Sequence, residues 1–393
     1  LGLNEKTIPV VQKLKKSSIP FGKIFVASWG ARGTPASDFH LDKPINDFCK
    51  KMVKGKNIGR YMLIYEGKWF LYDPSKLYRP SFPELFENDK ILINEVTGPT
   101  GLIGTFDSAK YYTDHSVCCC VQKHLLKNVD KGILMKHKFY IDEEEIESSK
   151  QYDPKYVLAI INSKLLNFYF STLLGYELNV YPESLEKLPI YEIDFSNSLE
   201  KKKHDELAQL ADKMLFLNKQ LKTTNVDFDR YLTEPIIGYA KFKDYYDKLD
   251  INDKKALDKT SKGNIKRIKV EDQDSWLTFK ADYFTKTDKT KQEFTDIPVL
   301  KCKFEDVSVR KFLLHIFQNY KKHWGSGNLL SKILNTPIPC FDKNPEKNNQ
   351  TIEKIMREFL KALEEKERLE KEIQQTDNTI DAKVYELYGL TPE

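Results

Sequence analysis

Short apolar runs and apolar–polar alternation extend over residues 20–150, a pattern typical of β-strands. Strand-like runs occur at GKIFVASWG, KILINEV, LIGTF and SVCCCV, and segments rich in glycine, proline or asparagine separate them. The runs YMLIY and WFLY flank Glu66-Gly67-Lys68, which predicts a β-hairpin closed at that turn. We therefore expect a β-rich region in the first part of the chain.

Later in the chain the apolar period changes to that of α-helices. A helix is expected after Asp153 and Pro154, since aspartate is a good N-cap and proline suits the first turn. A longer helix is expected after Asn197, because Leu207, Ala211 and further apolar residues share one face. These patterns predict the α+β class.

A last long helix is expected to start near Thr351. Its apolar residues, which include Ile355 and Phe359, follow the 3-4 spacing of a helix that packs against another helix. We therefore expect a β-rich fold braced by a pair of long, antiparallel helices.

These elements predict four parts along the chain. They are a β-rich domain over 1–198, a spacer helix over 199–224, a second domain or insertion over 225–349, and a C-terminal spacer helix over 350–393 that pairs with the first helix. A short echo supports this layout, because EKLPIYEIDFSN precedes the first long helix and LNTPIPCFDKN precedes the second. In that echo Pro189 matches Pro337 or Pro339, and Asp194 matches Asp342.

Composition agrees with a globular protein of two domains. The 393 residues are 40% hydrophobic and 31% charged, with a net charge of +5. Six cysteines without a CxxC pair, and no signal peptide, predict a reducing, cytoplasmic location. No apolar stretch is long and uncharged enough for a membrane span, so no membrane partner is expected.

Motifs for catalysis are missing from the sequence. There is no GxxxxGK[ST], HExxH or GxSxG, and no Pro-Pro dipeptide of the kind that holds a flipped adenine. Cys118, Cys119 and Cys120 are expected in a buried strand, where neighbouring side chains point to opposite faces and do not converge on one ion. We therefore predict no catalytic, metal-binding or cofactor-binding residue.

Basic, glycine-containing loops are the main candidates for binding. Lys50 to Arg60 contains five basic residues, no acid, and both Gly55 and Gly59, a composition suited to a phosphate backbone. Arginine reads guanine with two hydrogen bonds, so the few arginines outside helices are better base-reading candidates than lysines. The alternative is that the lysine runs are solvated surface. The predicted DNA-binding residues are Trp29, Arg32, Lys54, Lys56, Asn57, Arg60, Tyr61, Arg79, Lys266, Arg267 and Lys322.

The segment VKGKNIGRYMLIYEGKWFLYDPSKLYRPSFPELFENDKILINEVTG resembles the C-terminal specificity region of TaqI-like and type IIG restriction–modification enzymes. YVLAIINSKLLNFYF, LEKLPIY and IDAKVYELYGLTPE follow in the same order, so the resemblance covers about 20–223 and 350 to the end. It implies a target recognition module for double-stranded DNA that is not catalytic by itself. It also implies that residues Lys54 to Arg60 approach DNA.

The same resemblance implies a partner. We expect an N6-adenine methyltransferase domain, upstream of Leu1 or attached non-covalently, and S-adenosylmethionine is expected there and not in this chain. The chain would then be part of a site-specific DNA methyltransferase or type II restriction enzyme.

One departure from the family leaves alternatives open. About 125 residues separate the two long helices, whereas simpler members join them almost directly. This layout is similar to a type I specificity subunit, which has two half-site readers and two spacer helices. A helical protein-interaction module without DNA binding is the other alternative.

Overall fold

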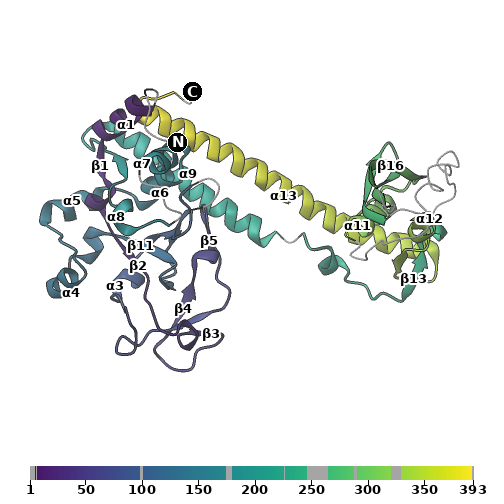
Figure 1. Cartoon of the computed structure of the whole chain (residues 1–393), viewed down its shortest axis with the longest axis horizontal. Helices are drawn as coiled ribbons and strands as arrows, with labels where there is room; N and C mark the ends of the chain where they lie inside the picture. The colour runs from purple at the N-terminus through teal and green to yellow at the C-terminus, as the bar shows by residue number, and fades with distance from the viewer. Residues whose placement is uncertain are drawn as a thin grey trace. The chain divides into compact units, whose positions relative to one another are not determined.

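A computed structural model describes the chain except for residues 1–4, 6, 98–100, 174–178, 225, 246–263, 287–289, 320–328 and 392–393. The chain divides into two compact units, and Figure 1 labels several of their helices and strands. Unit 1 comprises Leu1–Thr223 and Glu367–Glu393, and unit 2 comprises Thr224–Lys366. Helices and several sheets occur together, so the predicted α+β class is confirmed.

Unit 1 contains most of the short elements. Its strands are β1 Ser18–Pro20, β2 Phe25–Trp29, β3 His40–Leu41, β4 Cys49–Val53, β5 Ile58–Gly59, β6 Met62–Leu63, β7 Trp69–Leu71, β8 Lys90–Asn94, β9 Gly104–Asp107, β10 Tyr112–Thr113, β11 Val117–Gln122 and β12 Pro189–Tyr191. Its helices are α1 Thr7–Lys16, α2 Phe21–Ile24, α3 Glu84–Glu87, α4 Lys131–Lys136, α5 Glu143–Gln151, α6 Pro154–Asn162, α7 Lys164–Leu173, α8 Pro182–Leu185 and α9 Ser198–Thr223.

The central sheet of unit 1 is antiparallel, in the order β2-β11-β8-β9, and it is buried on both faces. Cys118 and Cys120 of β11 pack into one cluster of apolar side chains, which we name the first hydrophobic cluster, whereas Cys119 packs into another cluster on the opposite face. All three are fully buried, so the predicted strand is confirmed. Burial raises the pKa of the Cys119 thiol to about 12.

A second sheet has the order β10-β4-β7-β3. Here the predicted hairpin is wrong, because β6 pairs with β5 while β7 pairs with β3 and β4. The residues around Gly67, which has φ +76°, form a bend between two sheets. The tight turn lies instead at Arg60 and Tyr61, where Tyr61 has φ +54°. Apolar alternation marks strands but does not say which strands pair.

Helix α6 packs onto β8 and β9 of the central sheet, and α7 and α9 pack against α6. All three helices contribute to the first hydrophobic cluster, in which Leu158, Leu165 and Leu207 are buried. The Asp153 side chain caps α6 by accepting a hydrogen bond from the Lys155 amide, as the sequence predicts. The expected single helix is interrupted after Asn162, and α7 starts at Lys164.

The segment of α13 within unit 1, residues 367–387, lies along α9. Ile380 and Val384 are buried in the same cluster as Leu207 and Ala211 of α9. As residue numbers rise along α9 they fall along α13, so the two segments run antiparallel. The ion pairs between them are Lys203–Glu386 at 3.1 Å, Glu206–Lys383 at 2.6 Å and Lys213–Glu372 at 2.8 Å.

Unit 2 is built around an antiparallel meander, β14-β15-β16. Phe359 of α13 is buried in its core, with its ring 5.0 Å from Phe228 and 4.8 Å from His315. The strands are β13 Gly238–Lys241, β14 Asn264–Gln273, β15 Trp276–Lys286, β16 Lys291–Lys303 and β17 Pro337–Cys340, and the helices are α11 Val307–Gln318, α12 Leu329–Leu334 and α13 Pro345–Leu387.

Helix α13 starts at Pro345, six residues before the expected start at Thr351. Proline fits the first helical turn, and the Asn344 side chain accepts hydrogen bonds from the amides of Glu346 and Lys347. The apolar period begins only later, which is why the pattern alone placed the start too late.

The internal echo has a structural counterpart. β12 pairs with β1 and β17 pairs with β13, each as a two-stranded antiparallel sheet. After each strand an aspartate, Asp194 or Asp342, accepts the amide two residues on. An asparagine, Asn197 or Asn344, then accepts an amide at the start of the long helix.

Candidate nucleic-acid interface

The glycine-containing loop after β4 is folded into unit 1. Residues Gly55–Asn57 form a 3-10 turn in which the Asn57 side chain accepts the Lys54 amide at 2.9 Å. The Gly55 amide donates to Ser116 Oγ at 3.0 Å, and a Cβ atom at Gly55 would lie 2.6 Å from the Asn94 side chain. Asn57 is only 5% exposed, so it serves to hold the turn.

The lysines of this loop have partners from other parts of unit 1. Lys56 forms an ion pair with Glu66 at 2.7 Å, and this contact lowers the pKa of the Glu66 carboxyl. Lys54 Nζ lies 2.7 Å from His40 Nδ1. Burial, followed by the charge of Lys54, lowers the pKa of His40, so the ring accepts this hydrogen bond as neutral imidazole.

Arg60 is bonded to the last long helix. Its guanidinium donates to both carboxylate oxygens of Asp377, at 3.1 and 2.8 Å, and to the main-chain oxygen of Asn162 at 2.7 Å. The neighbouring Tyr61 is 1% exposed, and burial raises the pKa of its hydroxyl. In this arrangement Arg60 joins the β5–β6 turn to α13.

Arg32 and Arg79 lie opposite each other in an antiparallel β-bridge. The Arg32 amide donates to the Arg79 oxygen at 2.8 Å, and the Arg79 amide donates to the Arg32 oxygen at 3.0 Å. In such a pair the side chains leave the same face, with Cα atoms about 5.5 Å apart. Both arginines are exposed.

The ring of Tyr78 lies close to both guanidinium groups. Its centroid is 6.0 Å from Arg32 Cζ and 5.5 Å from Arg79 Cζ, within the range of cation–π attraction. Tyr78 is 65% exposed, so its ring is open to solvent beside the two guanidinium groups. We name Arg32, Tyr78 and Arg79 the Arg–Tyr–Arg cluster.

Buried neighbours hold the backbone of this cluster in place. A Cβ atom at Gly33 would collide with the ring of Phe39, and one at Gly30 would collide with main-chain oxygens of β10 and its following turn. In the segment that carries Arg79, the buried residues Leu77 and Phe82 lie on either side of the exposed Tyr78 and Arg79. The two segments therefore present their arginines from a packed scaffold.

Trp29, at the end of β2, is half-buried. Its ring meets the edge of Tyr181 at a centroid distance of 6.3 Å and packs against the first hydrophobic cluster. Among the residues that the structure describes, no aromatic or cation–π contact joins Trp29 to the Arg–Tyr–Arg cluster.

The basic residues predicted in unit 2 are paired with acids. Arg267 donates to Asp282 through Nε at 3.0 Å and Nη2 at 2.8 Å. Lys266 pairs with Glu293 at 2.8 Å, and the contacts of Lys266 and Lys291 lower the pKa of Glu293 to about 2. Lys322 lies outside the described residues.

A family model for a TaqI-like C-terminal specificity domain matches residues 50–190. The predicted family resemblance is confirmed over these residues. The matched TaqI-like range starts within β4 and ends within β12, so it contains Tyr78 and Arg79, whereas Arg32 and all of unit 2 lie outside it. A comparison with curated proteins found no match.

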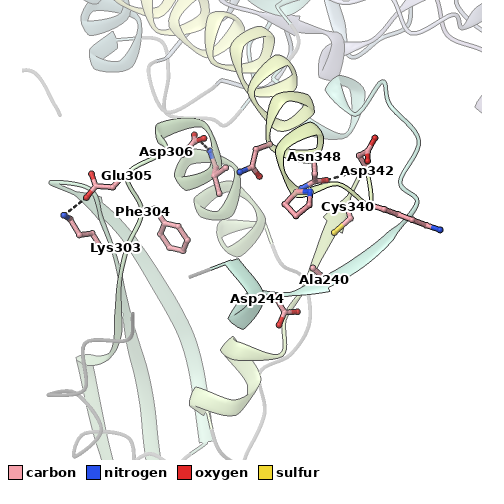
Figure 2. Close-up of a pocket in the computed structure, with 13 residues that line it drawn as sticks. Ala240, Asp244, Lys303, Phe304, Glu305, Asp306, Cys340, Asp342 and Asn348 are labelled. Atoms are coloured by element: carbon pink, nitrogen blue, oxygen red, sulfur yellow. Dashed lines mark hydrogen bonds and ion pairs between the residues drawn. The ribbon is translucent and has the colours of Figure 1, made fainter. Parts of the chain in front are cut away.

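The TaqI-like match does not extend to a cavity in unit 2 that has a volume of about 640 Å³. Figure 2 shows its polar side chains, most of which are engaged within the fold. Lys303 and Glu305 form an ion pair, Asp306 caps α11, and Asp342 accepts the Asn344 amide. In the described part of the chain, no group of three histidine, cysteine or acidic side chains is arranged to hold a metal ion.

None of the helices that the structure describes combines the length and apolar character needed to cross a bilayer.

Sequence reasoning named Arg32 and Arg79 separately but missed Tyr78, although it directly precedes Arg79. The structure brings these three residues together and keeps Arg60, Lys266 and Arg267 on carboxylates. An exposed aromatic beside a loop arginine is the signal that could have identified Tyr78.

Proposed function

We propose that this chain is the target recognition part of a restriction–modification DNA methyltransferase and binds double-stranded DNA in a sequence-specific manner. The observation that carries the proposal is the match of residues 50–190 to a TaqI-like specificity domain. The exposed Arg32 and Arg79 of unit 1 support it, because arginine is the side chain best suited to reading guanine.

In this proposal the chain supplies recognition and not chemistry. A methyltransferase domain, joined covalently or held non-covalently, would bind S-adenosylmethionine and transfer the methyl group, and both would act in the cytoplasm. The part played by our chain is to fix the register of that domain on DNA. Contacts to phosphates would position it and contacts to base edges would select the site.

The test is a selection from a randomised duplex library with the whole chain, alone and joined to its methyltransferase domain. We expect one sequence to be enriched, with affinity that falls steeply as salt rises. Enrichment of no sequence by either form would contradict the proposal. Binding that is insensitive to salt would also contradict it.

A type I-like subunit with two half-site readers is the second candidate. The repeated arrangement of β12 before α9 and β17 before α13 favours it. It predicts that the selected site has two parts at a fixed spacing, since spacer helices would set the distance between readers. A single continuous site would favour one reader.

A helical interaction module would need an open apolar face on α13. Ile355 and Phe359 are instead 1% and 3% exposed, in the core of unit 2. Replacing Phe359 by a charged residue should therefore unfold unit 2. The number of subunits should stay the same as in the wild-type protein. Loss of a dimer with unit 2 intact would favour the interaction module.

A further inference from the structure

The Arg–Tyr–Arg cluster differs from every other arginine site in the described chain. The sequence has eight arginines, and five of them bond to a carboxylate: Arg60, Arg267, Arg310, Arg357 and Arg368. A sixth, Arg230, is exposed in the 3-10 turn Phe228–Tyr231 of unit 2, away from any other arginine in sequence. Arg32 and Arg79 are the two arginines that face each other across a bridge. Neither makes an ion pair with any described carboxylate.

This arrangement is unfavourable for the isolated protein. Like charges directly opposite each other on neighbouring strands repel, and exposed guanidinium groups without acids lack a fixed counter-charge. The Tyr78 ring offsets part of that repulsion through its negative face, which attracts both cations. A bound group that is rich in hydrogen-bond acceptors would relieve the remainder.

We infer that the Arg–Tyr–Arg cluster is one reading unit that takes two guanines lying no more than two base steps apart. The inference rests on the proposed function and names the bases that this site would select. Each guanidinium would donate two N–H groups to the O6 and N7 atoms of one guanine in the major groove.

The geometry limits the distance between the two guanines. Residues opposed in a hydrogen-bonded antiparallel pair have Cα atoms about 5.5 Å apart, while successive bases of one strand are about 3.4 Å apart. The Cα atoms of the two arginines lie this close together, and both guanidinium groups lie near one tyrosine ring. The two side chains can therefore reach bases that are one or two steps apart. The buried neighbours Leu77 and Phe82 keep the backbone from spreading the pair apart.

Guanine and phosphate both accept from guanidinium groups, so the experiment must separate them. Arg32→Lys and Arg79→Lys each keep the positive charge but lose the two-pronged donor. Both side chains are exposed, so the substitutions should leave the fold intact. Arg267→Lys is the matched control, because that arginine is also exposed but is bonded to Asp282.

The wild-type chain and the three variants are each selected on a randomised duplex library. We expect two guanine positions within two steps in the wild-type site. Each cluster variant should lose at least about tenfold of the preference for guanine at one of these positions, with the other positions unchanged. Replacing that guanine by 7-deazaguanine, which lacks the N7 acceptor, should weaken the wild type but not the matching variant.

Three results would overturn the inference while the proposed function stands. They are a selected site without two such guanines, an equal loss of affinity for all sequences, and no change in the cluster variants. An equal loss would identify phosphate as the ligand. If the wild type selects no sequence, the proposed function fails together with this inference.

Discussion

Both units carry exposed basic residues on paired backbone segments, but the neighbours of these residues differ between the units. In the β14-β15-β16 sheet of unit 2, Arg267 of β14 pairs with Asp282 of the adjacent strand β15, and Lys266 of β14 pairs with Glu293 of β16. In unit 1, Arg32 and Arg79 lie against each other and a tyrosine. A run of basic residues in a sequence therefore says little about the field at the surface, since the acids that cancel it come from elsewhere.

Ion pairs also differ in burial between the units. Lys90 and Asp107 of unit 1 are both fully buried and lie 2.6 Å apart, with the Lys90 ammonium also donating to the Phe86 oxygen. Lys280 and Glu271 of unit 2 are 2.6 Å apart but stand partly in solvent. A buried charge depends on its partner far more than an exposed one does.

The largest effect is expected from Lys90→Met. It leaves the Asp107 carboxylate buried without its cation, which should lower the stability of unit 1 by about 3–5 kcal/mol. Hydrogen exchange of the β8 and β9 amides would measure the loss. The control, Lys280→Met, removes the exposed partner in unit 2 and should leave exchange in β15 almost unchanged. Equal effects in the two units would contradict the contrast in burial.

A smaller effect is expected at the joint between the β5–β6 turn and α13. Arg60→Gln and Asp377→Asn should each destabilise unit 1, and a double-mutant cycle should give a coupling of about 1–3 kcal/mol. Urea unfolding of the four proteins measures it, with the exposed Arg357→Gln as control. An unchanged stability together with altered DNA preference would instead make Arg60 the base reader that the sequence predicts.

As the pH is lowered, unit 1 should lose stability at a higher pH than unit 2. Burial lowers the pKa of His40, His124 and His137 in unit 1, and of His315 in unit 2. A histidine whose pKa is lower in the folded than in the unfolded state does not affect stability at pH values above the unfolded pKa, which is near 6.5. As the pH falls below that value, the unfolded state binds the proton more readily, and the fold is destabilised. Between pH 7.5 and 5.5 the protection factors of the amides, which correct for the slower intrinsic exchange in acid, should therefore fall more in β11 than in β15. His40→Gln should reduce that difference.

The smallest effect is expected on DNA binding from unit 2. Because Asp282 already holds its guanidinium, Arg267→Gln should change duplex affinity by less than about twofold. Titration of the selected duplex with both proteins measures this. A tenfold loss would show that unit 2 reads DNA, and would favour the two-reader candidate.

The sequence predicts the class of the fold and the strongest elements because those depend on local patterns. Strand β11, the α6 cap and helix α9 follow from apolar period and capping residues. The pairing of β7 with β3 and β4 depends on segments far from it in sequence, so alternation could not predict it. The early start of α13 rests on the Asn344 cap, which precedes the apolar period.

The candidate site shows the same limit. Arg32 and Arg79 could be named one by one, but only the β-bridge between them makes a site. Likewise, the basic run from Lys50 to Arg60 contains no acid, yet Asp377 approaches it from a position 317 residues away. Non-local partners decide which charges remain available.

Helix α13 also affects the order in which the protein can fold during synthesis. Ile380, Val384 and Tyr388 complete the first hydrophobic cluster of unit 1, but they are translated after all of unit 2. The core of unit 1 therefore stays incomplete until the end of the chain has been synthesised. Unit 2 is contiguous in sequence and can fold before that. A chain that ends before residue 380 would contain all of unit 2 but would lack part of the core of unit 1.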